Sequence, residues 1–238
     1  MTVSMLGAGL ALTRAPRPIA SVRGWTIDGV ASRAASAMRR GQAHVEPEFL
    51  STEELDSVRA DMTGMMAQIS TGDAFESIQT DLLDPQFRRT LPSPPPLCSV
   101  LETLDELRVA LARRSNRRLL EAGGLHLMFY PVGNGFMRHV DEDPSLSEPL
   151  RNSISLLLYL TPSDWTEADG GALCVYETAE GGGAPPRLVL PRGGTLVVYD
   201  STMEHEVLPT RRKRHLVSVR FREMDEDWQA RRDGELGD

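Results

Sequence analysis

Six short, largely apolar runs follow residue 123, and they constrain the fold more than any other feature of the chain. Each run is rich in Val, Leu and Tyr and is bounded by Gly, Pro, Asp or Ser. This pattern is typical of strands, and six strands at such spacing indicate a β-sandwich or barrel. The runs are GLHLMFYP (124–131), SISLLLYLT (153–161), GALCVYE (171–177), PRLVLP (186–191), GTLVVYD (194–200) and RHLVSVRF (214–221).

Two amphipathic helices are predicted before these strands. The first begins at Ser51, which forms a capping box with Glu54, and the second follows the helix-breaking LPSPPP segment. A strand is predicted between them within FESIQTDLL (75–83). Apolar residues recur at helical spacing at Leu55, Val58, Met62, Met65 and Ile69 in the first helix, and at Leu97, Val100, Leu101, Leu104, Leu107 and Leu111 in the second.

Helices followed by a run of strands indicate an α+β protein with a mainly β core. A double-stranded β-helix, or jelly roll, with supporting N-terminal helices accommodates this number and length of strands. Strands and helices do not alternate, and no glycine-rich loop precedes a helix, so Rossmann and P-loop folds have no support.

Length and charge narrow the function. The 238 residues fit one ordinary domain with extensions, and the net charge of −8 with a pI near 5.2 disfavours a nucleic-acid partner. No apolar run reaches the roughly 18 residues of a membrane span, which predicts a soluble intracellular protein. Cys98 and Cys174 are distant in sequence and indicate two buried thiols in a reducing compartment, with no disulfide framework.

The charge is unevenly distributed. Residues 1–45 hold six arginines and one acid, a net charge of +5, which leaves −13 for the remainder. We therefore expect three segments: a basic extension (1–41), a catalytic domain (42–223) and an acidic tail (224–238). The extension has the composition of a transit peptide or of a disordered basic arm, so the protein is cytoplasmic, or organellar if the extension is a transit peptide.

Three residues have the types and placement of a metal site. His139 and Asp141 form a His-x-Asp pair after a glycine-rich turn, and His205 follows at the end of a predicted strand. The pair alone is weak evidence, because a solvated loop would look the same. Two imidazoles and one carboxylate on adjacent strands would form the facial triad of Fe(II) oxygenases, whereas a structural zinc would require a fourth protein ligand.

Four segments in order carry a resemblance to a known family: YPVGNGFMRHVDED, LLLYLTPSDWTEADGGALCVYE, PRGGTLVVYDSTMEHEVLPT and RHLVSVRF. They resemble the catalytic core of the 2-oxoglutarate- and Fe(II)-dependent prolyl 4-hydroxylases, especially the hypoxia-sensing type. The resemblance spans about residues 42–223 and is tightest over 130–221. It includes the His-x-Asp pair, a glycine pair after Trp165, a His-Glu-Val-x-Pro and an arginine nine residues after His205.

The resemblance implies a role for each matched residue. His139, Asp141 and His205 bind Fe(II). Arg214 binds the distal carboxylate of 2-oxoglutarate, since a guanidinium pairs with a carboxylate through two parallel hydrogen bonds. The remaining matches concern the cosubstrate pocket: Tyr130 and Tyr159 as hydrogen-bonding tyrosines, Ser218 as the hydroxyl residue beside Arg214, and Leu173 and Leu157 as apolar walls.

The implied activity is that of a peptidyl-proline 4-dioxygenase. Such an enzyme hydroxylates a proline in a protein or peptide partner and couples this to decarboxylation of 2-oxoglutarate to succinate and CO2. It requires Fe(II) and O2, with ascorbate as the reductant. Two alternatives remain open: the same chemistry on a free amino acid or small metabolite, and a non-catalytic binding module on the same fold.

Three departures bear on substrate identity. The aromatic residue that the hypoxia-sensing enzymes carry near the end of the last core strand is Arg220 here. The Arg-x-Asp of the early strand reads Gln79-Thr80-Asp81, and the substrate-covering loop matches poorly at DPQFRRTLPSPPP. Binding of iron and cosubstrate is therefore better supported by the sequence than the choice of a prolyl substrate.

Overall fold

The computed structural model describes residues 25–69, 76–78, 95–120, 124–143, 145, 149–178 and 185–224. The helices are α1 (Ile27–Arg39), α2 (Thr52–Ile69), α4 (Pro96–Ser115) and the 3-10 helix η3 (Glu167–Asp169). The strands are β1 (His44–Glu46), β2 (Glu76–Ile78), β3 (Gly124–Tyr130), β4 (Phe136–His139), β5 (Leu150–Tyr159), β6 (Leu173–Val175), β7 (Arg187–Val189), β8 (Leu196–Asp200), β9 (His205–Val207) and β10 (Arg214–Met224).

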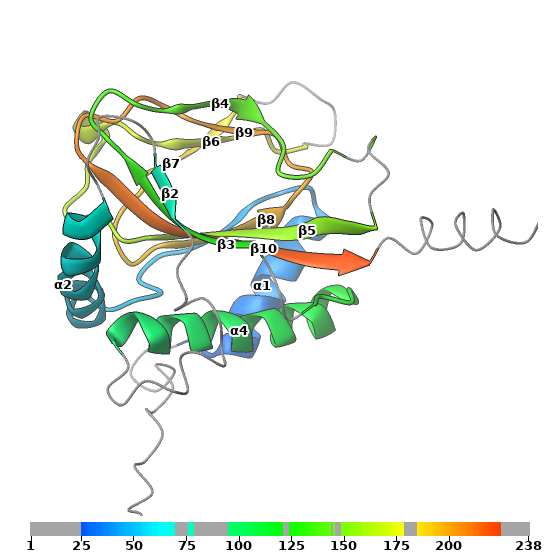
Figure 1. The fold of residues 1–238 in the computed structure, drawn as a ribbon. Helices are drawn as coiled ribbons and strands as arrows, with labels where there is room; N and C mark the ends of the chain where they lie inside the picture. The colour runs from blue at the N-terminus through cyan, green and yellow to red at the C-terminus, as the bar shows by residue number, and fades with distance from the viewer. Residues whose placement is uncertain are drawn as a thin grey trace, which may run out of the picture.

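Two antiparallel sheets form the centre of the molecule. The larger has the strand order β1-β8-β5-β10-β3-β2, and the smaller has the order β4-β9-β6-β7. Figure 1 shows the smaller sheet stacked over the larger one, with α1 and α4 on the opposite side of the larger sheet. This arrangement confirms the predicted α+β class with a mainly β, jelly-roll core and supporting helices.

The predicted helices are present where their sequence signals place them. Ser51 and Glu54 exchange the hydrogen bonds of a capping box, since each backbone N–H donates to the other residue's side-chain oxygen. Helix α4 begins at Pro96, whose missing N–H costs nothing in the first turn. The apolar positions predicted along α4 are all buried against the sheet: Leu97, Val100, Leu101, Leu104, Leu107 and Leu111.

The central strand β5 is buried on both faces. Leu156 and Leu158 belong to the apolar cluster that includes the helices, while Leu157 and Tyr159 belong to a second cluster between the sheets. This double burial explains why the SISLLLYLT run is almost continuously apolar instead of alternating. The second cluster borders the cavity described below.

All six strands predicted after residue 123 are present, and the structure adds three further short strands. Strands β1, β4 and β9 have three or four residues each, and β4 is largely exposed. Of the strand predicted within 75–83, the structure describes only β2. The departures at residues 79–81, and the covering loop up to residue 94, lie outside the described residues, as do residues 225–238 of the expected acidic tail.

The folded unit begins earlier than the charge distribution suggested. Helix α1 packs against α4, β1 and β8, and Val30, Ala31 and Ala34 are fully buried. Thr26 caps the helix by accepting a hydrogen bond from the Gly29 N–H. The expected boundary between residues 41 and 42 therefore separates α1 from a core to which it belongs, and residues 1–24 lie outside the described residues.

Two further expectations concern cysteines and membranes. Cys98 and Cys174 are both free thiols and both buried, as predicted. Within the part of the chain that the structure describes, no helix combines the length and the apolar character needed to cross a bilayer.

Helix α1 allows a direct test of the revised boundary. Ala34→Asp would bury an unpaired carboxylate, so the free energy of unfolding should fall by roughly 3 kcal/mol or more. Ser32→Asp adds the same charge on the exposed side of the same helix and should change it by less than about 0.5 kcal/mol. Urea unfolding of the two variants measures the difference, and equal stabilities would contradict the packing of α1 on the core.

Candidate metal and cosubstrate site

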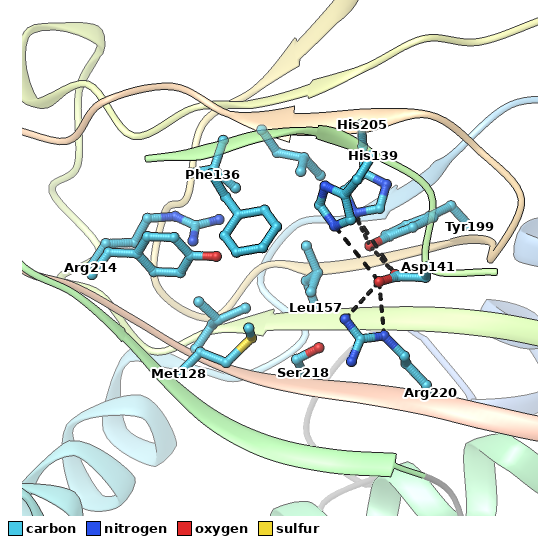
Figure 2. Close-up of a pocket in the computed structure, with 14 residues that line it drawn as sticks. Met128, Phe136, His139, Asp141, Leu157, Tyr199, His205, Arg214, Ser218 and Arg220 are labelled. Atoms are coloured by element: carbon cyan, nitrogen blue, oxygen red, sulfur yellow. Dashed lines mark hydrogen bonds and ion pairs between the residues drawn. The ribbon is translucent and has the colours of Figure 1, made fainter. Parts of the chain in front are cut away.

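Strand pairing brings two histidines together. Strands β4 and β9 pair antiparallel with His139 directly opposite His205, and the two imidazole centroids are 4.2 Å apart. Asp141 follows β4 by two residues, where the Asn152 side-chain amide donates to its backbone carbonyl at 2.8 Å. Two strands and one turn thus place the three predicted residues in one cluster (Figure 2).

The same backbone contact orients both histidines. His139 Nδ1 lies 2.8 Å from the Met137 carbonyl oxygen, and His205 Nδ1 lies 2.9 Å from that of Met203. With Nδ1–H donating to a carbonyl, Nε2 carries the lone pair in each ring. Both Nε2 atoms are turned toward Asp141, at 3.9 Å from Oδ1 for His139 and 3.8 Å from Oδ2 for His205.

Asp141 is buried among hydrogen-bond donors. Arg220 approaches Oδ1 through Nε at 2.8 Å and Nη2 at 2.6 Å, and the Tyr199 hydroxyl donates to Oδ2 at 3.1 Å. Burial alone would raise the pKa of Asp141, but the charge of Arg220 and the hydrogen bond from it outweigh burial and lower the pKa. Burial, followed by the nearby Asp141 charge, raises the pKa of Tyr199, which therefore remains a protonated donor.

The cluster fits a divalent metal ion with open coordination positions. The ligand atoms of His139, Asp141 and His205 all lie within 4.8 Å of one another, and no fourth His, Cys, Asp or Glu joins them among the described residues. Burial also lowers the pKa of His205, which favours the neutral imidazole that a metal requires. Two imidazoles and one carboxylate suit Fe(II) and leave coordination positions for other ligands.

Arg214 lies at the other end of the same cavity (Figure 2). Its side chain is fully buried, and its guanidinium carbon lies 4.7 Å from the ring centre of Tyr130 and 5.1 Å from that of Tyr159. A side chain at Gly171 would crowd it, since a Cβ there would lie 3.3 Å from Arg214 Cδ. Gly171, the second glycine of the pair after Trp165, therefore leaves room for Arg214 and for Thr210, whose Oγ1 would lie 2.9 Å from that Cβ.

At the arginine end of the cavity, no carboxylate of the described residues pairs with Arg214. None of the three Arg214 guanidinium nitrogens has a hydrogen-bond partner, and neither does the Tyr159 hydroxyl. These are four of the six buried side-chain nitrogen and oxygen atoms in this condition within the described part of the chain. Since burying an unpaired charge is costly, their concentration at one place indicates a binding site for an anion.

Most of the residues predicted for the site line this cavity, together with several that the sequence analysis did not assign. Tyr159 lies behind Arg214 and is not part of the lining, although its ring packs on the guanidinium. The predicted lining residues are Tyr130, His139, Asp141, Leu157, Leu173, His205, Arg214 and Ser218. The additional ones are Met128, Phe136, Tyr199, Val207, Leu216 and Arg220.

Strand alternation is the signal that could have found Tyr199 and Arg220. Arg220 is six residues from Arg214 and two from Ser218, so all three lie on one face of β10. Tyr199 shares a face of β8 with Val197, which packs in the cluster between the sheets. Both positions could therefore have been assigned to the cavity once the strands were known.

A protein-family comparison agrees with this geometry. Residues 125–222 match the model of the 2OG-Fe(II) oxygenase superfamily. The matched segment is therefore similar to that superfamily. It includes the His-Asp-His cluster, Arg214 and Arg220. A sequence search of curated proteins finds no match.

Several solved structures share the fold of this chain. A Pseudomonas putida prolyl-4-hydroxylase superposes with a TM-score of 0.64 at 24% identity, covering 82% of this chain and all of that one. A Trichoplax adhaerens prolyl hydroxylase, solved with a hypoxia-inducible factor peptide, gives 0.66 at 17% identity and covers 86% and 93% of the two chains. SnoN, an α-ketoglutarate-dependent epimerase of nogalamycin biosynthesis, gives 0.56 at 15% identity with 80% and 81% covered.

The unpaired arginine yields a prediction about stability. Arg214→Met removes a buried charge that has no partner, so the ligand-free protein should become more stable, by about 1 kcal/mol. Arg108 is a matched control, because it is also buried but donates to Asp105 and to the Leu119 carbonyl. Arg108→Met should lower the free energy of unfolding by roughly 1–3 kcal/mol, and chemical denaturation would show whether the two effects have opposite signs. A large loss of stability in Arg214→Met would mean that the guanidinium already has a partner.

Proposed function

We propose that this protein is an Fe(II)- and 2-oxoglutarate-dependent dioxygenase that hydroxylates a prolyl residue of a peptide or protein. One observation carries the proposal: three potential metal ligands and a buried arginine without a carboxylate partner lie at opposite ends of one cavity. A dicarboxylate that reaches from the metal to the arginine fits this arrangement. The family of residues 125–222 supports the same cosubstrate.

Each end of the cavity would hold one part of the cosubstrate complex. His139, Asp141 and His205 would bind Fe(II), while Arg214 would pair with the distal carboxylate of 2-oxoglutarate, with Tyr130 beside it in the cavity wall. Leu157 and Leu173 would contact the methylene carbons between them and exclude water. When bound, iron and 2-oxoglutarate supply the oxidising chemistry, in which one atom of O2 enters succinate, the other enters the substrate, and CO2 is released.

The prolyl substrate is supported by the two prolyl hydroxylases that share the fold. A second candidate is the same chemistry on a free amino acid or small metabolite, and it is favoured by Arg220, whose guanidinium lies beside Asp141. The fold shared with the epimerase SnoN shows that this fold is not confined to prolyl hydroxylases. Succinate formation with Fe(II), ascorbate and 2-oxoglutarate, measured against prolyl peptides and free proline, tests both. A mass increase of one oxygen on free proline alone would replace the first candidate by the second.

The metal ligands can be tested without turnover. His139→Ala and His205→Ala should each weaken Mn(II) binding by more than about 100-fold, because a three-ligand site has no redundant member. His44→Ala is the control, since His44 lies on β1 and bonds Glu46 away from the cluster. Electron paramagnetic resonance of free Mn(II) measures the affinities, and succinate formation should fall in parallel. Wild-type affinity in both histidine variants would refute the assignment.

The cosubstrate arginine can be tested by a conservative change. Arg214→Lys keeps the charge but loses the planar two-point contact, so the apparent KM for 2-oxoglutarate should rise about 10- to 100-fold. Arg212→Lys is the matched control, because Arg212 is more exposed and pairs with Asp164 and Asp169 outside the cavity. If Arg212→Lys raised the KM and Arg214→Lys did not, the carboxylate would bind at the neighbouring arginine.

A further inference from the structure

Strand β10 carries two arginines into the cavity. Arg214, Leu216, Ser218 and Arg220 alternate along its inward face and line the cavity from the cosubstrate end to the metal end. In Figure 2, Arg220 extends toward Asp141 while Arg214 lies on the opposite side of the cavity. The second arginine pairs with Asp141 but would contact neither Fe(II) nor 2-oxoglutarate in the proposed complex, so its outer donors have no assigned partner.

The charges of the cavity lining indicate that Arg220 would lack a full counter-charge once a metal ion is bound. The lining contains two arginines against the single carboxylate of Asp141, which leaves one positive charge. A divalent cation and a dicarboxylate cancel each other, so binding both leaves this excess unchanged. Once Asp141 shares its charge with a metal ion, Arg220 is the arginine without a full counter-charge. Semi-buried cations in such sites are normally paired with an anion.

Arg220 is also placed to reach an incoming molecule. Its side chain is 26% exposed, whereas that of Asp141 is 3% exposed. Nε and Nη2 approach Asp141 Oδ1, and Asp141 is the acceptor that they contact among the described residues. A guanidinium has five N–H donors, so most of them remain for another oxygen atom. The pairing with Asp141 fixes the guanidinium beside the metal ligands while its outer donors stay accessible.

We propose that Arg220 binds a carboxylate of the primary substrate next to the metal ligands His139, Asp141 and His205. This inference rests on the proposed function and adds the chemical class of the substrate. A guanidinium and a carboxylate pair with defined geometry, so the contact would fix the carbon atoms adjacent to that carboxylate close to His139, Asp141 and His205. The carboxylate belongs either to a free amino acid or to an acidic residue beside the proline in a peptide.

Two matched ligand pairs separate these sources. L-proline and L-prolinamide differ only in the carboxylate of the free amino acid. Capped prolyl peptides with Glu or Gln after the proline differ only in the acidic side chain. Binding of all four to the full-length protein, saturated with Mn(II) and 2-oxoglutarate, would be measured by calorimetry. Within one pair the neutral ligand serves as the internal reference, so any change in metal affinity cancels.

The wild-type protein should bind the acidic member of at least one pair about 10-fold or more tightly than its neutral match. In Arg220→Gln this ratio should fall below about 2, and in Arg220→Lys it should be intermediate, because the charge remains without the fork. Arg222→Gln removes the same charge from an exposed position of the same strand and should keep the wild-type ratio.

Three results would overturn the inference. A ratio near 1 for both pairs in the wild-type protein would show that no carboxylate is recognised. An unchanged ratio in Arg220→Gln would assign the recognition to another residue. A 10-fold weaker affinity for 2-oxoglutarate in Arg220→Gln, with an unchanged ratio, would assign Arg220 to the cosubstrate. The proposed function has a separate test. A wild-type protein that bound neither Mn(II) nor 2-oxoglutarate would refute both proposals, whereas the three results above would not affect the proposed function.

Discussion

Side-chain alternation along β5, β8 and β10 divides the interior of the molecule in two, and both the core and the cavity depend on it. On one face, Leu156, Val198 and Val217 pack in the cluster formed with the helices. On the other, Leu157, Tyr199 and Leu216 pack between the sheets. A register shift of one residue would exchange these faces and turn the inward arginines of β10 away from the cavity. The helices fix the register, because their apolar stripes require the first face.

Strand pairing within the smaller sheet supplies the site residues that the larger sheet lacks. The larger sheet supplies Arg214, Ser218 and Arg220, whereas β4 and β9 supply the two histidines. The site therefore exists only when the two sheets stack. Its ends also differ in how their polar groups are satisfied, since the acceptors and donors around Asp141 pair with one another while no carboxylate of the described residues pairs with Arg214. In the proposed function, the end with the histidines is organised before ligands bind, and the end with Arg214 gains its counter-charge from the ligand.

Much of the fold could be predicted because the elements that build the core have strong local signals. The leucine stripe of α4, the capping box of α2 and the six apolar strands reflect burial of one or two faces. Strands β1, β4 and β9 gave no such signal, because each has only three or four residues and is held by pairing with a neighbouring strand. Helix α1 was misassigned from charge: its arginines Arg33 and Arg39 lie on the exposed side, and small alanines face the core. Each alanine buries little apolar area and so gives a weak amphipathic signal, but it allows close packing.

The site was predictable to the extent that its residues lie in recognisable spacing. The His-x-Asp pair, His205 and Arg214 stand in sequence positions that the family resemblance identifies. Tyr199 was not assigned to the site because an inward strand tyrosine looks like an ordinary core residue. Arg220 was noted only as a departure from the hypoxia-sensing enzymes. Its contact with Asp141 depends on how β10 and the turn after β4 meet in space, which no local pattern encodes.

The two faces of the larger sheet also contribute differently to the stability of the folded state. A buried arginine without an acceptor destabilises the folded state, and the net stability of a domain is only about 5–15 kcal/mol. The cost is tolerable because the apolar cluster under the helices lies on the opposite face of the larger sheet and does not depend on the cavity. Binding of an anion at Arg214 would remove the cost and add stability to the strands that line the site. In the proposed function, part of the free energy lost by burying the arginine without a counter-charge would return as affinity for a ligand that carries a carboxylate.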